Sequence, residues 1–221
     1  MVVFMKTIVI TSQKGGSGKT TLAAHLAVEA ERAGDAPAWL IDTDEQGTLS
    51  QWHDRREHDT PHRAEMPFAQ IAKGLANMAE RGAAYCFIDT APTISPQSKA
   101  IINMADLVLI PVRPSPADLW AVSETVALVK QAGKPFLFVI TQAKPQATIT
   151  AQTIAALSQH GRVAEAFISD RVPYAGAMTG GRTAPELAPK SPAADEITRL
   201  WLNVKSCFHE NIKSVRKVKH G

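Results

Sequence analysis

The sequence predicts an α/β fold, in which a doubly wound, mostly parallel sheet is flanked by helices on both faces. Two observations support this prediction. Short, wholly apolar runs alternate with longer amphipathic segments, and a glycine-rich loop joins the first apolar run to the first amphipathic segment. Strands that are apolar throughout are typical of parallel sheets covered on both faces. Because there is no repeat and no long linker, we expect one domain over residues 1–212 and a basic tail over residues 213–221.

Strands are expected where the apolar runs are short and end at turn residues. In chain order they are Thr7–Thr11, Ala38–Ile41, Tyr85–Ile88, Leu107–Val112, Phe136–Thr141 and Val163–Ser169. None of these runs approaches the roughly 18 apolar residues that a membrane-spanning helix needs.

Helices are expected where apolar residues recur every three or four positions between start and stop signals. In chain order they are Thr20–Arg32, Thr48–Glu57, Phe68–Arg81, Pro96–Met104, Pro116–Gln131, Thr148–Gln159 and a closing helix from Pro192 to about Ile212. The closing helix has the clearest apolar face, made of Ile197, Leu200, Trp201, Val204 and Phe208. Trp120 is expected to pack in the core. Residues 171–192 are rich in glycine and proline and predict an irregular segment with a functional or connecting role.

The composition excludes several classes of protein. Of 221 residues, 45% are hydrophobic and 20% charged, which excludes a disordered, collagen-like or coiled-coil chain. The two cysteines, Cys86 and Cys207, lie too far apart to indicate a disulfide framework or a CxxC metal site, so we expect a reducing, cytoplasmic setting. The net charge of +3 is uneven, because residues 1–98 carry 9 Lys/Arg against 12 Asp/Glu and residues 99–221 carry 15 against 9.

The strongest functional signal is the stretch from Gln13 to Thr21, QKGGSGKTT, between the first strand and the first helix. Its glycines let successive backbone amides point at an anion, and the start of a helix adds the positive end of its dipole. Lys19 would contact the β- and γ-phosphates of a nucleotide, and the Thr20 hydroxyl would bind Mg²⁺. The expected nucleotide-binding residues are Gly15, Gly16, Ser17, Gly18, Lys19, Thr20 and Thr21. The fold is therefore of the P-loop NTPase type, although Gln13 replaces the usual first glycine and an extra lysine, Lys14, follows it.

Acidic residues follow the next two predicted strands. Asp42 and Asp44 come at the end of the second strand, and Asp89 ends the third. Ligands of open α/β sheets bind beyond the carboxyl ends of the strands, where carboxylates hold Mg²⁺ through water or orient an attacking water. We expect Asp89 to act at the metal with Thr20. Asp42 either holds water at the metal or braces the loop, and the residues alone leave both roles open.

Together these motifs resemble the ParA/MinD family of deviant Walker A ATPases, over about residues 5–205. The matching stretches are residues 14–20, 42–46 and 89–92. Residues 110–118, IPVRPSPAD, and the segment from Gly181 to Ile197 are similar to the plasmid-partition branch. The chain looks most like the small plasmid-encoded members of the family.

The resemblance implies an ATPase that forms a homodimer around ATP and Mg²⁺. Lys14 would reach the partner's ATP, and Asp44 would position the attacking water, so Lys14, Lys19 and Asp44 are the expected catalytic residues. Arg171 and Pro173 would lie in a turn that contacts the base, and whether that base must be adenine stays open. ATP-bound dimers of the family bind DNA non-specifically, and a ParB-like, partition-site-binding partner stimulates their slow hydrolysis. A cytoplasmic, nucleoid-associated protein is expected on this basis.

Two positions depart from the family pattern. Glu45 stands where the family usually has proline between the aspartate and glutamine of its second motif, which adds a negative charge near the site. Pro173 stands where some relatives carry an arginine implicated in DNA contact. DNA contacts must therefore be argued from charge. The candidate cations are Arg171, Arg182, Lys190, Arg199, Lys205, Lys213, Arg216, Lys217 and Lys219.

Other functions compete with DNA segregation. The same chemistry would serve to position a non-DNA cargo, or to gate a scaffold that binds ATP but barely hydrolyses it. A ligase of the dethiobiotin or cobyrinate synthetase type shares the fold and loop, but the sequence shows no motif for its carboxylate substrate. A MinD-like membrane helix at the C-terminus is disfavoured, because beyond Ile212 only Val215 and Val218 are apolar. We expect no stable membrane association.

Overall fold

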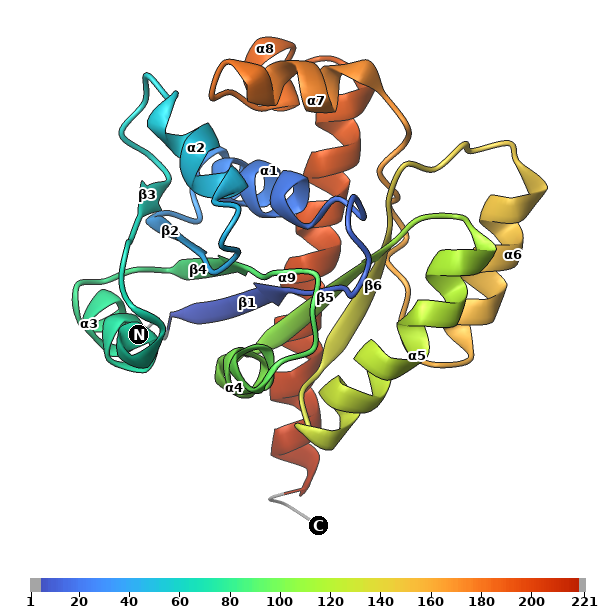
Figure 1. Cartoon of the computed structure of the whole chain (residues 1–221), viewed down its shortest axis with the longest axis horizontal. Helices are drawn as coiled ribbons and strands as arrows, with labels where there is room; N and C mark the ends of the chain where they lie inside the picture. The colour runs from blue at the N-terminus through green and yellow to red at the C-terminus, as the bar shows by residue number, and fades with distance from the viewer. Residues whose placement is uncertain (1–4, 219–221) are drawn as a thin grey trace.

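The computed structural model describes residues 5–218, and the side chains of residues 5–209. Its centre is a six-stranded sheet in the order β3-β2-β4-β1-β5-β6, in which all paired strands are parallel (Figure 1). The strands are β1 (Lys6–Ile10), β2 (Ala38–Asp42), β3 (His62–Arg63), β4 (Tyr85–Asp89), β5 (Leu107–Val112) and β6 (Phe136–Ile140). The predicted fold class is confirmed.

Helices cover both faces of the sheet. One face carries α1 (Lys19–Arg32), α2 (Thr48–Asp54), α7 (Val172–Thr179), α8 (Ala184–Leu187) and α9 (Pro192–Val218). The other carries the short 3-10 turn η1 (Phe68–Gln70), α3 (Ile71–Glu80), α4 (Pro96–Met104), α5 (Pro116–Gln131) and α6 (Thr148–Ser158). Successive strand residues point to opposite faces, so Ile8 and Ile10 join the first core and Val9 the second. In the part of the chain that is described, every helix is too short or too polar to cross a bilayer.

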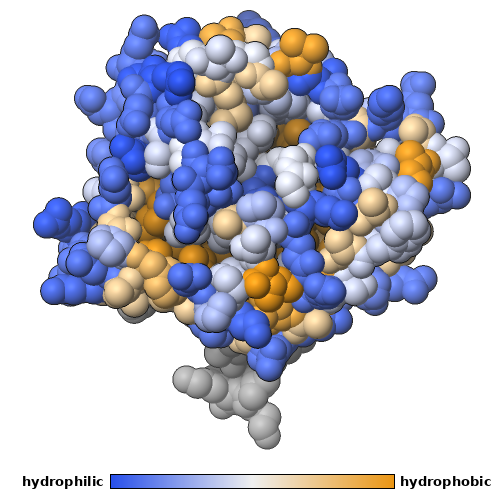
Figure 2. Space-filling model, viewed as in Figure 1, coloured by the Kyte–Doolittle hydropathy of each residue, from blue (hydrophilic) through white to orange (hydrophobic). Residues whose placement is uncertain are grey.

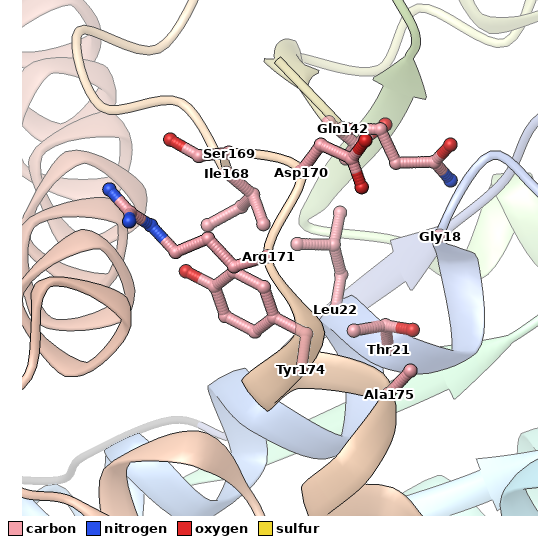
Figure 3. Close-up of a pocket in the computed structure, with 11 residues that line it drawn as sticks. Gly18, Thr21, Leu22, Gln142, Ile168, Ser169, Asp170, Arg171, Tyr174 and Ala175 are labelled. Atoms are coloured by element: carbon pink, nitrogen blue, oxygen red, sulfur yellow. The ribbon is translucent and has the colours of Figure 1, made fainter. Parts of the chain in front are cut away.

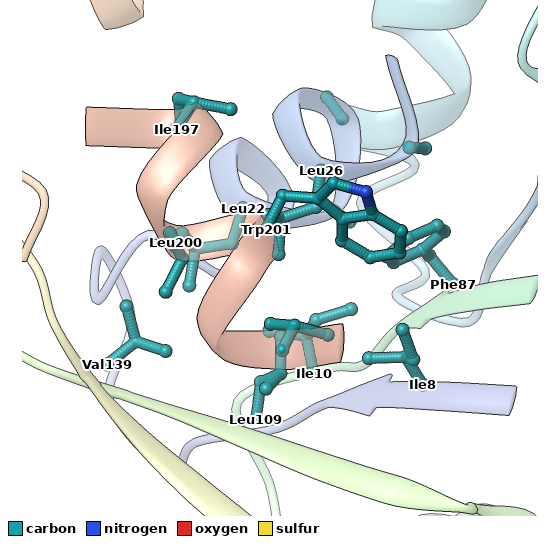
Figure 4. Close-up of a cluster of buried hydrophobic side chains, with 14 of the residues drawn as sticks. Ile8, Ile10, Leu22, Leu26, Phe87, Leu109, Val139, Ile197, Leu200 and Trp201 are labelled. Carbon is teal, nitrogen blue, oxygen red and sulfur yellow. The ribbon is translucent and has the colours of Figure 1, made fainter. Parts of the chain in front are cut away.

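The closing helix α9 packs against the first face of the sheet. Its predicted apolar face is buried, and Trp201 packs edge-on against Tyr85 and lies over Phe87 (Figure 4). Each fully buried side chain of this size contributes roughly 1.5–3 kcal/mol through removal from water. The helix continues past Ile212 to Val218, so residues 213–218 extend it, whereas residues 219–221 lie outside the described chain.

Several predictions about individual elements are wrong. The expected strand Val163–Ser169 forms only two isolated bridges, one between Val163 and Phe138 of β6 and one between Ser169 and Ala143 beyond the end of β6. Between these bridges the outer segment has one residue more than the inner one, so a continuous register is impossible. The segment 171–192 is not irregular, because it forms α7 and α8.

The position of Trp120 is a further correction. The residue is 79% exposed on α5, outside both cores, because the buried face of α5 is made instead of Val122, Val126 and Val129. The two-residue edge strand β3 has no signal in the sequence.

Candidate nucleotide-binding site

The register of the sheet brings the predicted motifs to one edge. Asp89, at the end of β4, is level with Ile10 at the end of β1 and with Asp42 at the end of β2. The loop that follows Ile10 leads into α1, whose first residue is Lys19. The phosphate loop and the two acidic motifs therefore share the carboxyl edge of the sheet, where open α/β sheets bind ligands.

The phosphate loop has the backbone conformation that its glycines predict. Gly16 and Gly18 have φ angles of 70° and 93°, in the left-handed region that other residues avoid. Its carbonyl groups are held from outside the loop: Thr141 Oγ1 donates to the Ser17 carbonyl (2.8 Å) and Gln142 Nε2 donates to the Gly16 carbonyl (2.7 Å). With carbonyls tied outward, the loop amides are free to face an anion.

Gln142 is a candidate site residue that the sequence did not reveal. Its φ of 50° makes it the one non-glycine residue with positive φ in the described chain. Residues held in this region are found at functional sites, where surrounding structure supports the strain. The hydrogen bond to Gly16 supplies that support and ties the end of β6 to the phosphate loop.

Arg113 approaches the phosphate loop from β5. Its Nε and Nη2 donate to the two carboxylate oxygens of Asp118, at 3.0 and 3.1 Å. Its remaining Nη1 lies beside Gly16, within 3.6 Å of where a Cβ would stand on that glycine. Asp118 belongs to the segment that matched the plasmid-partition branch, and the structure shows that it orients a cation toward the phosphate loop.

Lys19, the predicted phosphate-binding lysine, lies at the start of α1. The residue is buried, and its ammonium donates to the Lys14 carbonyl at 3.3 Å. Burial lowers the pKa of Lys19, and the carboxylates of Asp89 and Asp44 oppose that shift. Lys14 itself is partly buried at the start of the loop.

Thr20 and Asp89, the predicted magnesium ligands, lie in direct contact. The Thr20 hydroxyl donates to Asp89 Oδ2, while Asp89 Oδ1 is buried without a partner among the described residues. Burial raises the pKa of Asp89 to about 7, a shift that the Thr20 hydrogen bond opposes. A hydroxyl and a carboxylate with an unused oxygen fit Mg²⁺, which prefers oxygen ligands and usually adds water and substrate phosphates. Bound there, the ion would neutralise phosphate charge. No group of three or more His, Cys, Asp or Glu in the described chain forms a separate metal site.

Asp42 braces the loop that follows β2. Its Oδ1 accepts from the Asp44 amide (3.1 Å) and its Oδ2 from the Ser50 amide (2.9 Å). Of the two roles left open by the sequence, these contacts support bracing. Asp44 accepts from the Gln46 amide (3.0 Å) and borders a groove between this loop and α4.

A cavity of about 200 Å³ opens beside the phosphate loop (Figure 3). Its lining consists of Gly18, Thr21, Leu22, Thr141, Gln142, Ile168, Ser169, Asp170, Arg171, Tyr174 and Ala175. The predicted Thr21 and Arg171 therefore border it, whereas Pro173 is exposed and not part of the lining. Tyr174 and Asp170 had no sequence signal, because only the fold brings the turn after Ser169 to the start of α1.

The Arg171 guanidinium points away from this cavity toward α9 (Figure 3). There it pairs with the buried Glu196 at 2.9 Å. Glu196 also accepts from the Ser169 amide and hydroxyl and from the Tyr174 hydroxyl (2.6 Å). These hydrogen bonds keep the pKa of Glu196 below its usual value despite burial, and they fix the wall of the cavity.

The candidate DNA-binding cations are not equally available. Lys205 pairs with Asp35 (2.7 Å) and Arg199 with Asp195 (3.0 Å), in addition to the Arg171 pair. Arg182 and Lys190 have no ion-pair partner in the described part of the chain. Lys213, Arg216 and Lys217 lie in the end of α9 whose side chains are not described, and Lys219 lies outside the described residues.

Comparison with known proteins identifies the family. The CobQ/CobB/MinD/ParA nucleotide binding domain family matches residues 8–183. The chain belongs to this family. It is 26% identical over 204 residues to maintenance of carboxysome distribution protein A of Halothiobacillus neapolitanus, covering 88% of this chain and 94% of that protein. It is 29% identical over 129 residues to protein ParA of Rhizobium radiobacter, covering 58% and 57% of the two chains.

A solved structure supports the fold. The septum site-determining protein MinD of Pyrococcus horikoshii, complexed with Mg-ADP, superposes with a TM-score of 0.74 at 16% identity, covering 90% of this chain and 96% of that one. The predicted relationship to ParA/MinD ATPases is thus confirmed. The family is one of nucleotide-binding domains, and the matched residues 8–183 include the phosphate loop.

Proposed function

We propose that this protein is a positioning ATPase that dimerises on ATP, binds DNA non-specifically and is released when a partner stimulates hydrolysis. The observation that carries the proposal is the joint placement of Lys14, Lys19, Thr20, Asp44 and Asp89 at one sheet edge. In this proposal Lys19 and the loop amides hold the phosphates, Thr20 and Asp89 hold Mg²⁺, and Asp44 orients water. Lys14 reaches the nucleotide of a second protomer.

The cargo in this proposal is DNA, carried with a ParB-like, site-binding partner. The resemblance of residues 110–118 to the plasmid-partition branch and the match to ParA support it. A protein assembly as cargo is the second candidate, since the match to the carboxysome distribution protein spans 94% of that relative and the ParA match spans 57% of its relative. Deleting the gene in its host separates them: plasmid loss favours the first, and mispositioned protein assemblies with stable plasmids favour the second.

A DNA-binding titration tests the switch. Fluorescent duplex DNA is titrated with the chain in ATP, in ADP and without nucleotide. We expect tight binding with ATP alone, because dimerisation doubles the number of cations on one surface. Asp44→Ala should bind DNA in ATP without release over time, since it keeps the phosphate loop but lacks the group that orients water. Equal affinity in ATP and ADP would refute the switch.

Light scattering tests dimer formation separately. Asp44→Ala with ATP should run as a dimer, and Lys19→Ala as a monomer. A monomeric Asp44→Ala protein that demonstrably holds ATP would rule out the nucleotide-bridged dimer.

A further inference from the structure

Arg113 presents a fixed cationic donor to the phosphate loop. It directly follows β5, and two of the three nitrogens of its guanidinium donate to the carboxylate of Asp118. The third nitrogen, Nη1, has no hydrogen-bond partner among the described residues. It stands 3.6 Å from the place that a Cβ of Gly16 would take. The Arg113 side chain is 32% exposed, so a ligand can reach it.

Asp118 holds the guanidinium in this orientation. Its side chain is buried and also accepts from the Ser115 hydroxyl (2.6 Å). Burial alone would raise the pKa of Asp118, but hydrogen bonds from Arg113 and Ser115 keep that pKa below its usual value, so the carboxylate is ionised at neutral pH. A paired contact of this kind fixes the plane of a guanidinium. Nη1 therefore cannot turn away from the phosphate loop unless both hydrogen bonds to Asp118 break.

The start of α5 does not require Arg113 for its own structure. Ser115 is the N-cap residue, and its hydroxyl oxygen accepts from the Asp118 amide (3.2 Å). Asp118 lies in the first turn of the helix, where the helix dipole already favours a negative charge. Capping of α5 is thus complete without a cation, and it does not explain why Nη1 is directed at the phosphate loop.

The surroundings of Nη1 suit an anion. Gly15 and Gly16 are exposed, and the Gly16 carbonyl already accepts from Gln142 Nε2. The phosphate loop, which joins β1 to α1 in the middle of Figure 1, is covered in Figure 2 mostly by hydrophilic and neutral residues. This surface offers little to an apolar ligand, whereas a phosphate oxygen would accept a charge-assisted hydrogen bond from Nη1.

We propose that Arg113 is a phosphate-binding residue of the nucleotide site and that Asp118 is the residue that positions it. Nη1 would donate to a phosphate oxygen of ATP, in addition to the contacts made by Lys19 and the loop amides. Either of two nucleotides would supply that oxygen: the one bound by the same protomer, or the one bound by a second copy of the chain. The identity of the ligand as ATP rests on the proposed function.

Titration with a fluorescent, non-hydrolysable ATP analogue tests the role of Arg113. Arg113→Met should weaken binding by about tenfold or more, because it removes a charge-assisted hydrogen bond to phosphate. This variant also leaves the buried Asp118 without its cation, so the double variant Arg113→Met/Asp118→Asn is measured beside it. The double variant should bind as weakly as Arg113→Met, since both lack the cation. Recovery of affinity in the double variant would refute the phosphate contact, because the loss would then come from the unpaired carboxylate.

The positioning role of Asp118 has its own readout. Asp118→Asn in the otherwise unchanged chain should weaken binding by a smaller factor than Arg113→Met, because the cation remains but is no longer held. In the Arg113→Met background the same change should have no further effect, since a positioning residue acts only through the residue that it positions. Unchanged affinity of Asp118→Asn would refute this role.

A matched control and a second measurement complete the test. Arg81→Met removes an exposed arginine at the end of α3, shortly before β4 begins and at the opposite edge of the sheet from the phosphate loop, so it should bind the analogue like the unchanged protein. Arg113→Met must differ from Arg81→Met in analogue binding or in dimer formation by light scattering. Equal behaviour of the two variants in both measurements would refute the proposal.

The same two measurements identify the source of the phosphate. A contact within one protomer weakens binding to dilute, monomeric protein and leaves the saturated variant able to dimerise. A contact across the dimer leaves binding to the monomer unchanged and reduces the dimer fraction at saturating analogue. An unchanged chain that binds no analogue would refute the proposed function, which is a different result from an unchanged chain that binds it and an Arg113→Met variant that binds it equally well.

Discussion

His25 should make the stability of this protein fall in mildly acidic solution. The ring is fully buried in α1, where Nδ1 bonds to the Thr21 carbonyl (2.8 Å) and Nε2 lies 3.1 Å from the Ala184 amide. An amide can only donate, so Nε2 accepts and the proton of the neutral ring sits on Nδ1. A second proton would break the contact with α8, and burial lowers the pKa of His25 to about 4 from its usual 6.5.

The direction and size of the effect follow from this shift. Between pH 4 and 6.5 the unfolded chain binds more protons at this position than the folded chain, so stability rises with pH across that window. At pH 5 the loss is about 2 kcal/mol relative to pH 7.5, since each pH unit within the window is worth about 1.4 kcal/mol.

Urea unfolding followed by tryptophan fluorescence measures the effect. The free energy of unfolding is determined at pH 7.5 and pH 5 for the unchanged chain and for His25→Gln, which has no titrating ring. Protonation of carboxylates whose pKa is lowered in the folded state, such as Glu186 and Glu196, also reduces the free energy of unfolding in acid. The informative quantity is therefore the difference in this loss between the two proteins. The unchanged chain should lose about 2 kcal/mol more than the variant. Equal losses would refute the reasoning, whatever the absolute stability of His25→Gln.

Three substitutions test other parts of the structure. Lys19→Ala should abolish binding of a fluorescent ATP analogue, and retained tight binding would contradict the phosphate-loop assignment. Gln142→Ala should weaken nucleotide binding by about fivefold through loss of one hydrogen bond. The same nucleotide titration would contradict this role if the affinity for nucleotide were unchanged in a variant that urea unfolding shows to be strongly destabilised. Arg56→Met should lower the free energy of unfolding by about 3–5 kcal/mol, because the mostly buried Glu186 loses its ion-pair partner at 2.8 Å; a loss below about 1 kcal/mol in urea would contradict it.

The sequence predicted those parts of the fold whose residues carry a local pattern. Wholly apolar runs predicted the five longer strands. The glycine-rich sequence of the phosphate loop predicted the backbone conformation of that loop. Trp120 was assigned wrongly because a large aromatic residue on a helix is more often buried than exposed, and only the packing of α5 shows which face it takes. The strand expected at Val163–Ser169 has strand-like residues, but its register with β6 is broken, and register is a property of the pair.

The sequence pattern led to the residues that the fold gathers at the carboxyl edge of the sheet, but not to Gln142 or Tyr174. Lys19, Thr20 and Asp89 belong to motifs in which neighbouring residues carry the chemistry. Gln142 and Tyr174 belong to no motif, because their roles depend on contacts with Gly16 and Glu196 far away in the sequence. The left-handed backbone of Gln142 could not be anticipated either, since glycine or asparagine would be the usual residue at such a position.

The ion pairs also change what the basic second half of the chain can contribute to DNA binding. Arg171 pairs with the buried Glu196, and releasing it for a phosphate would leave that carboxylate unpaired, at a cost of several kcal/mol. Lys205 shares Asp35 with the indole nitrogen of Trp201, so it is also held in place. The Arg199 pair with Asp195 is exposed on both sides and opens at little cost.

Of the candidate DNA-binding cations with described side chains, three per protomer, Arg182, Lys190 and Arg199, are therefore available to phosphate. In an ATP-bound dimer whose tail residues Lys213, Arg216, Lys217 and Lys219 are changed to glutamine, these would make about six contacts. The logarithm of DNA affinity should then fall with the logarithm of salt concentration with a slope of about −5. If Arg171 and Lys205 also opened, ten contacts would give a slope of about −9. A slope near −9 in the tail-neutralised dimer would show that these two ion pairs yield to DNA, and Arg171 would then not stay paired with Glu196 in the DNA-bound dimer.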